Sequence, residues 1–251
     1  MSSYIARYSN ASTRDMVLSE SEMQTNAVWI WQYMSRKGWT LNAVAGMLGN
    51  AQAESTINPA RPQNNAVNNK WYPSVPGWAG DAPSPTDTWY GYGLFQTTPY
   101  AALSGRRYNP HNYGNWAMTH GYTFSWATGG TGGQMEPQLD WLASAEPSTP
   151  YYNDAEPSAN QQKWYQHSRS PLNAPTTAAY GALTGSPEEC AITFYWNFER
   201  SGALDPGNRP QYARDWYTFL GGIPPTPPTP ERRKMPFILL AYSAGIFGRT
   251  K

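Results

Sequence analysis

The feature that most constrains this 251-residue chain is a stretch from Pro59 to about Thr131 that is dominated by Pro, Gly, Asn and Trp. Proline lacks the amide donor that helices and inner strands need, and glycine loses the most conformational entropy when it is ordered. The stretch contains a single short strand-like run, at 92–97. It is too long for an ordinary loop, so we expect a functional lobe with hairpins of its own.

The composition indicates a folded domain that does not bind nucleic acid. The chain has 18 Lys+Arg against 17 Asp+Glu and a formal charge of +1, whereas a nucleic-acid binder needs a basic surplus to displace counterions from phosphates. Aromatic residues make up 15% of the chain, and a disordered chain would lack them. Trp and Tyr rings suit a sugar-binding surface, although a packed core uses the same rings.

The single cysteine, Cys190, excludes an intrachain disulfide framework and a cysteine-based zinc site. We expect a buried small hydrophobe, because Glu188 and Glu189 raise the pKa of the thiol, which is the wrong direction for a nucleophile. The N-terminal residues lack the apolar run of a classical signal peptide. Action outside the cytoplasm is therefore expected to need another route.

Helical periodicity lies on both sides of the Pro- and Gly-rich stretch. A first helix is expected from near Thr25 to Gly38, with one apolar face made of Ala27, Ile30, Trp31 and Met34. Thr40 is expected to cap a second helix, which ends around residues 55–58 because Pro59 follows. Gly46 and Gly49 within it let another backbone approach closely.

Three further helices are expected in the second half of the chain. Residues 138–143 carry a helical pattern, and Ser186 with Glu189 forms a capping box before another helix. The last helix follows Arg209 and stops at residues 221–222. Its inward side chains are expected to be Tyr212, Trp216, Phe219 and Leu220.

The pattern divides the chain into an N-terminal arm (1–22), one globular domain (23–222), a stiff Pro-rich linker (223–234) and a short apolar segment (235–251). Residues 235–248 would span about 21 Å as a helix, short of the hydrocarbon core of about 30 Å. We therefore expect a docking or interfacial segment. The basic residues 232–234 keep membrane contact open as an alternative.

Residues 49–59 contain the strongest candidate for catalysis. Glu54 falls at the C-terminal end of the second helix, where the negative end of the helix dipole disfavours a carboxylate. Apolar neighbours such as Ile57 act in the same direction. A carboxyl group that keeps its proton near neutral pH can serve as a general acid. An ordinary exposed glutamate at a helix end is the alternative interpretation.

The run GNAQAESTINPARPQNN at 49–65, followed by YGYGLFQTTP at 90–99, resembles the phage tail lysozyme family. This family is related to goose-type lysozymes and lytic transglycosylases. Residues 138–142, 194–200 and 212–217 resemble its later helices, so the resemblance covers about residues 23–222. It implies a mainly α, lysozyme-like α+β fold, in which a helical domain and a small β-hairpin lobe enclose a glycan cleft.

The resemblance also implies cleavage of the β-1,4 bond between N-acetylmuramic acid and N-acetylglucosamine in peptidoglycan, without a cofactor or metal. Glu54 would protonate the glycosidic oxygen. Asp87 is the nearest acid upstream of the Gly93–Gln96 motif and is a candidate water-orienting base, although a turn role is open. Without such a base, amides and hydroxyls hold the water, or the muramyl hydroxyl attacks, as in lytic transglycosylases.

Five further residues are candidates for binding the glycan. Gln96 offers both a donor and an acceptor to an N-acetyl group, and Tyr92 and Trp71 offer stacking surfaces. Tyr195 and Asn197 resemble a Tyr-Asn pair that lytic transglycosylases use against substrate. Packing is the alternative role for each aromatic ring.

The sequence also bears on two other functions. The three His lack an H-x-x-E-H pattern, which argues against a zinc endopeptidase, and an inactive glycan-binding tail protein remains an alternative. A lysozyme carried by the virion in the phage tail would need no signal peptide, because the particle delivers it to the bacterial wall during genome entry. The termini would then attach to other tail proteins. A late-acting endolysin would fit the same residues.

Overall fold

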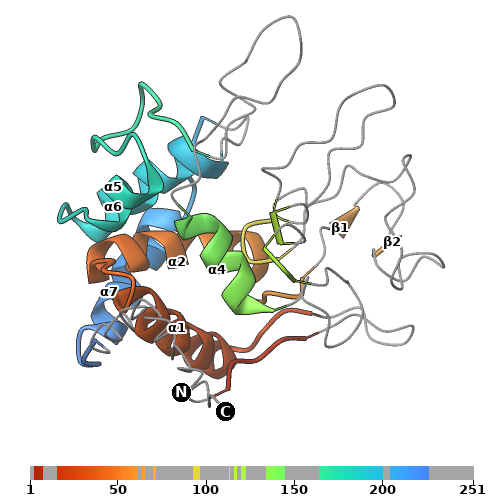
Figure 1. Ribbon diagram of the computed structural model, residues 1–251. Helices are drawn as coiled ribbons and strands as arrows, with labels where there is room; N and C mark the ends of the chain where they lie inside the picture. The colour runs from red at the N-terminus through yellow and green to blue at the C-terminus, as the bar shows by residue number, and fades with distance from the viewer. Residues whose placement is uncertain are drawn as a thin grey trace, which may run out of the picture.

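The computed structural model describes residues 3–7, 16–61, 64–65, 70–71, 93–96, 113, 116–117, 120–122, 134–144, 164–199 and 204–225, with the backbone alone at 64–65 and 70–71. The helices in this part are α1 (Glu20–Ser35), α2 (Leu41–Ser55), α4 (Met135–Ala143), α5 (Thr177–Gly181), α6 (Pro187–Phe194), the π-helix η3 (Tyr195–Glu199) and α7 (Arg209–Leu220) (Figure 1). Strands β1 (Asn64–Asn65) and β2 (Lys70–Trp71) pair antiparallel, with Asn64 opposite Trp71. The mainly helical class is confirmed, whereas the hairpin lobe and the glycan cleft stay predictions.

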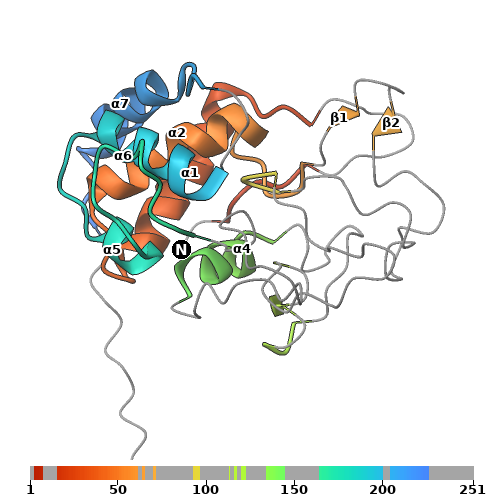
Figure 2. The ribbon, with the colours of Figure 1, turned by 90° about the horizontal axis from the view of Figure 1, so that it is seen from above.

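Helix α2 lies at the centre of the bundle. Every residue from 43 to 51 is buried, and α1, α6 and α7 pack against it (Figures 1 and 2). A helix that is covered on all sides is positioned by its neighbours rather than by its own propensity. The predicted cap is confirmed, since the Thr40 hydroxyl accepts a hydrogen bond from the Ala43 amide at 3.1 Å. Packing against three other helices thus fixes the position of α2, which carries Glu54 near its C-terminal end.

Two glycines bring α6 and α7 close to α2. A Cβ atom at Gly46 would lie 2.6 Å from Cys190 Cβ and 2.7 Å from the backbone nitrogen of Ala191. One at Gly49 would lie 2.5 Å from the carbonyl oxygen of Arg209. These separations are shorter than real Cβ contacts, so the close backbone approach predicted at both positions is confirmed.

Helix α1 begins at Glu20, earlier than the expected start near Thr25 and inside the stretch assigned to the arm. A capping box forms between Ser19 and Glu22, and the Ser19 amide donates to Glu22 Oε2 at 2.8 Å. Hydrophobic periodicity missed this turn because its residues are polar. Upstream, Ile5 exchanges hydrogen bonds with the Asn26 side chain, at 2.7 and 2.9 Å. The described part of the arm therefore packs on the domain.

Helix α7 has the predicted bounds but a different buried face. Ala213, Trp216 and Leu220 are buried, whereas Phe219 is 37% exposed, so its inward placement was wrong. The helix turns 100° per residue, which puts Phe219 beside the buried stripe rather than on it. The Phe219 and Trp216 rings make a T-shaped contact, with their centroids 5.9 Å apart.

Aromatic rings fill the core between α2, α4 and α6. Phe194 contacts the rings of Trp164, Tyr180 and Phe198, with centroids 4.9–5.7 Å apart. The polar atoms of these rings are also paired: Trp164 Nε1 donates to the Ala174 carbonyl at 2.7 Å, and the Tyr180 hydroxyl donates to a carbonyl of α2 at 2.8 Å. Much of the aromatic content therefore serves packing.

Cys190 is fully buried, which confirms the predicted small hydrophobe. Burial, then Glu189 and Glu188, raise the pKa of its thiol to about 12, so almost none is thiolate at pH 8. We expect the folded protein to resist iodoacetamide and to take up one label after denaturation. Intact mass measures the label, and stoichiometric labelling of the folded protein at the rate of a free thiol would contradict this prediction.

Among the described residues, no helix has the length and apolar character to cross a membrane. The apolar segment 235–251 and most of the Pro-rich linker lie outside the described residues. Ile223 is described, and its carbonyl accepts a hydrogen bond from Trp31 Nε1 at 2.9 Å. The chain after α7 therefore returns to α1.

Candidate active site

Glu54 is the penultimate residue of α2. The chain leaves this helix through Thr56 and Ile57, whose φ angles are +53° and +58°. Few residues other than glycine adopt this conformation, and a β-branched residue does so only when its surroundings impose it. Ile57 is fully buried. Packing therefore fixes a sharp turn directly behind Glu54.

Two buried asparagines support this turn. The Asn58 side chain donates to the carbonyls of Arg7 and Met16, both at 2.9 Å, and accepts from the Arg7 amide at 3.2 Å. Asn26 donates to the Ile57 carbonyl at 2.9 Å. Because buried polar groups left without partners are costly, these bonds tie the N-terminal residues to the turn.

The Glu54 carboxylate is paired with an arginine from the start of α7. Its Oε1 atom accepts from Nη2 of Arg209, and the two side chains are 23% and 16% exposed. The guanidinium of Arg209 also lies over the Tyr195 ring, 4.9 Å from its centroid, and Nη1 donates to the Pro206 carbonyl at 3.0 Å. An arginine held at three points fixes the direction of the carboxylate.

The structure places Tyr195 and Asn197 on the π-helix η3, within the core. Tyr195 is buried, and its hydroxyl donates to the Asp205 carbonyl at 3.4 Å. Asn197 is also buried; its amide accepts from the His167 backbone at 2.9 Å and donates to the Ala174 carbonyl at 3.1 Å. Tyr195 thus lies under Arg209, and Asn197 joins η3 to the segment before α5. Their roles toward substrate stay predictions.

Residues 93–96 form a turn, not the strand-like run expected over 92–97. Gly93 and Gln96 have φ angles of +80° and +49°, which an extended strand does not allow. The Ser55 hydroxyl donates to the Leu94 carbonyl at 2.9 Å. This bond joins the turn to the end of α2, one residue after Glu54.

Gln138 on α4 holds the other side of this turn. Its Oε1 atom accepts from the Leu94 amide at 2.9 Å, and its Nε2 atom donates to the Pro59 carbonyl at 2.7 Å. The φ angle of Gly93 strains other residues, and a Cβ atom there would lie 2.2 Å from Gln138 Oε1 and displace that side chain. The turn is therefore fixed relative to both α2 and α4.

Of the remaining predicted site residues, only Gln96 has a described side chain. Gln96 belongs to the turn, and its Nε2 atom donates to the carbonyls of Arg61 and Gly93 at 2.9 and 3.1 Å. Trp71 lies in β2, but its side chain is outside the described residues, as are Tyr92 and Asp87 altogether. In the described ranges, no group of three or more His, Cys, Asp or Glu could hold a metal ion.

Arg209, Ser55 and Gln138 are the site residues that sequence reasoning did not find. Arg209 is 155 residues from Glu54 in the chain, and no local pattern connects them. Gln138 was noted only as part of a helical motif. What the structure brings together is Glu54, Arg209 with Tyr195, and the 93–96 turn through Ser55.

The general-acid role predicted for Glu54 implies that Arg209→Gln lowers the rate of peptidoglycan cleavage about 10- to 100-fold, because small errors in the position of a catalytic group are costly. Turbidity loss of purified peptidoglycan measures the rate, and thermal melting checks the fold. Arg214→Gln is the matched control, since Arg214 lies on the same helix and pairs with Glu188 while 61% exposed. An unchanged rate in folded Arg209→Gln would contradict this role.

Comparisons with known proteins identify the family of the chain. The chain is similar to morphogenesis protein 1 of Bacillus phage B103, with 31% identity over 213 residues. The matched region is 84% of this chain and 43% of the relative, so the chain spans less than half the length of that protein. The family model for phage tail lysozymes matches residues 25–220. The chain therefore belongs to the phage tail lysozyme family.

Proposed function

We propose that this chain is a virion-associated lysozyme that cleaves the β-1,4 bond between N-acetylmuramic acid and N-acetylglucosamine in peptidoglycan. The observation that carries the proposal is the setting of Glu54: a partly exposed carboxylate at the end of a buried helix, joined through Ser55 to the 93–96 turn. Membership of the phage tail lysozyme family supports a lysozyme-like glycosidase.

Glu54 acts as the general acid in this proposal. Arg209 contacts Oε1, so Oε2 is the oxygen that carries the proton to the glycosidic oxygen as the sugar gains oxocarbenium character. Gln96, Tyr92, Trp71, Tyr195 and Asn197 are the residues proposed to bind the glycan. No cofactor or metal takes part.

The second half of the reaction has two proposed routes. Asp87 orients a water molecule that attacks the anomeric carbon and leaves a reducing N-acetylmuramic acid. In the second route the muramyl hydroxyl attacks instead, the C–O bond to the leaving sugar breaks, and an anhydro product lighter by one water forms. The masses of the products separate the two routes.

Delivery by the phage particle is the proposed setting of the activity. The phage tail lysozyme family and the phage morphogenesis protein relative support a phage-associated protein. The enzyme would open the cell wall locally during genome entry, attached through its termini to other tail proteins. Mass spectrometry of purified particles tests this setting; complete absence of the protein from them would favour a late-acting endolysin.

Peptidoglycan zymography tests for catalysis itself. The proposal predicts a cleared zone at the position of this chain. Retention on insoluble peptidoglycan without any clearing would contradict it and favour the alternative, an inactive glycan-binding tail protein.

A further inference from the structure

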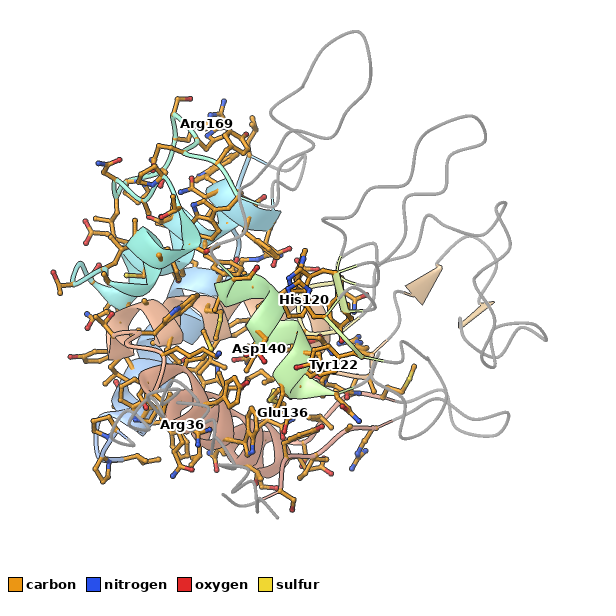
Figure 3. The ribbon with its side chains drawn as sticks, in the orientation of Figure 1. Arg36, His120, Tyr122, Glu136, Asp140 and Arg169 are labelled. Carbon is orange, nitrogen blue, oxygen red and sulfur yellow. The ribbon has the colours of Figure 1, made fainter. Side chains whose placement is uncertain are left out.

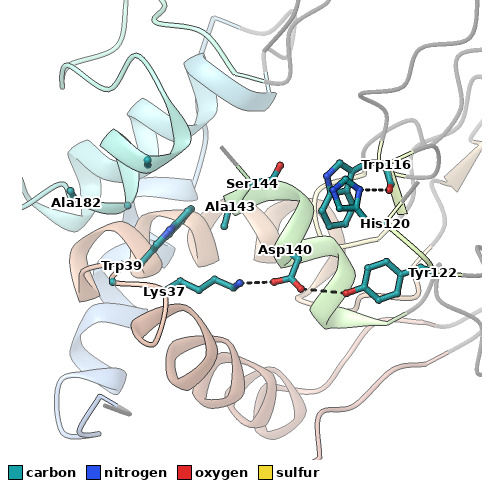
Figure 4. A pocket seen from close by; sticks show the side chains of 12 residues that line it. Lys37, Trp39, Trp116, His120, Tyr122, Asp140, Ala143, Ser144 and Ala182 are labelled. Carbon is teal, nitrogen blue, oxygen red and sulfur yellow. Dashed lines mark hydrogen bonds and ion pairs between the residues drawn. The ribbon is translucent and has the colours of Figure 1, made fainter. Parts of the chain in front are cut away.

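A pocket of about 490 Å³ lies at the other end of α2 from Glu54. Its walls come from the α1–α2 connection, α4, α5 and the short described segments 116–117 and 120–122 (Figure 4). Trp39 lines the pocket just before α2, whereas Glu54 is near the last residue of that helix. At about 1.5 Å per residue, the two sites are roughly 20 Å apart along the helix. The pocket is thus separate from the candidate active site.

The pocket has an aromatic wall opposite small side chains. The His120 ring is stacked on Trp116, with centroids 4.2 Å apart and planes 20° from parallel, and His120 Nδ1 is 2.8 Å from the Trp116 carbonyl. Ala143 and Ala182 line other parts of the pocket. Small residues leave room there for a ligand, and ring faces suit a flat, weakly polar one.

A paired carboxylate lies among these rings. Asp140 contacts Lys37 Nζ at 2.7 Å, accepts from the Tyr33 hydroxyl at 2.7 Å and from the Tyr122 hydroxyl at 3.5 Å. Figure 3 shows Asp140, His120 and Tyr122 in one region of the molecule. Burial and the nearby Asp140 raise the pKa of Tyr122, so its phenol keeps its proton and remains a donor.

These groups match an N-acetylated sugar. The hydroxyl groups of the sugar can hydrogen-bond to the carboxylate of Asp140, the ammonium of Lys37 and the phenol of Tyr122. A pyranose face can stack on an aromatic ring of the pocket, and the acetamide methyl group can contact the alanines. The charges of Lys37 and Asp140 compensate each other, so the pocket favours a neutral ligand over an anionic or cationic one. The size of the pocket falls within the range of about 300–1,000 Å³ that small-molecule sites occupy.

We propose that this pocket is a second glycan-binding site, which holds N-acetylhexosamine units of peptidoglycan away from the catalytic centre. The inference rests on the proposed function, because the substrate is then a polymer that can reach both sites. Occupying two sites on one polymer raises the effective concentration of glycan at Glu54 without any new catalytic group. The site therefore acts on capture of the wall rather than on the chemical step.

The histidines provide a direct reporter, because the chain has only three. We would titrate the Glu54→Gln protein with the tetramer of N-acetylglucosamine and follow the histidine ring signals by NMR, with His120→Gln to assign the His120 signal. The expected result is a saturable shift of the His120 signal. No shift at saturating tetramer, or a shift produced only by a stem peptide without sugar, would overturn the inference.

A pocket-filling variant tests the same site independently. Ala182 is exposed and lines the pocket, whereas Thr184 is exposed and does not. Ala182→Trp is expected to raise the Kd of the tetramer, measured from the His120 shift, at least tenfold, whereas Thr184→Trp should leave this Kd within twofold. Thermal melting confirms that both variants fold. An equal response in both variants would overturn the inference.

Steady-state kinetics on intact peptidoglycan distinguish a failure of this inference from a failure of the proposed function. In the active protein, Ala182→Trp should raise KM for intact peptidoglycan two- to tenfold while kcat stays the same. If the tetramer produces no His120 shift in the Glu54→Gln protein while the unaltered protein cleaves normally, the second site alone is refuted. Tetramer binding at His120 in a protein that cleaves nothing would refute the proposed function and leave the binding site standing.

Discussion

Glu54→Gln is expected to lower the rate of peptidoglycan cleavage about 10²- to 10⁴-fold, the usual contribution of a general acid. Glutamine keeps the size of the side chain, and its carbonyl oxygen can still accept from Arg209, but an amide cannot deliver the proton that the leaving sugar needs. The loss corresponds to about 3–5 kcal/mol of transition-state stabilisation. Initial rates of turbidity loss on purified peptidoglycan measure it.

Glu188→Gln is the matched control for this experiment. Glu188 also pairs with an arginine of α7, Arg214, but it lies in the first turn of α6 rather than at the end of α2. Its substitution should change the rate less than twofold. Folded Glu54→Gln that cleaves at the rate of the unaltered protein would rule out the general-acid role.

Gly46→Ala is expected to destabilise the fold by about 2–3 kcal/mol, the upper part of the range for overpacked cores. In an unobstructed helix the same substitution would stabilise by about 0.5–1 kcal/mol. Here the added Cβ would meet Cys190 Cβ at 2.6 Å and the backbone of Ala191 at 2.7 Å. Because a backbone cannot rotate away as a side chain can, α6 must move.

Urea unfolding followed by tryptophan fluorescence measures this change. Gly222→Ala is the control, since beyond its chain neighbours no atom of the described residues lies within 4 Å of the position that its Cβ would take. It should alter the free energy of unfolding by less than about 0.5 kcal/mol. Equal unfolding midpoints for Gly46→Ala and the unaltered protein would show that α2 and α6 are not packed as closely as described.

Local signals predicted the longer helices, whereas the five-residue α5 was not predicted. Thr40 and Ser186 cap helices through their own side chains, and Gly221 follows the last residue of α7. These features depend on residues within four positions of one another, so the pattern contains them. The start of α1 was missed because its capping box precedes the first apolar residues. Hydrophobic periodicity alone cannot detect a polar first turn.

Features set by distant contacts could not be predicted in the same way. The 93–96 segment has the composition of a strand, yet hydrogen bonds from Ser55 and Gln138 hold it as a turn. Tertiary contacts override β-propensity in such segments. The partner of Glu54 was also hidden, because Arg209 reaches it only once α7 has packed on Gly49.

No sequence pattern predicted the pocket near Trp39. Its polar pair joins Lys37, just after α1, to Asp140 on α4, and His120 comes from a third segment. Each residue alone has the sequence context of an ordinary surface or core position. Aromatic content suggested sugar binding for the chain as a whole, but only the structure separates packed rings from those that line a pocket.

The most direct test of the central claim is mass spectrometry of the soluble fragments released from purified peptidoglycan. We expect fragments that end in N-acetylmuramic acid, either reducing or lighter by one water, and their near absence with Glu54→Gln. Fragments that end in reducing N-acetylglucosamine, cleavage confined to the stem peptides, or an unchanged yield from Glu54→Gln would contradict it.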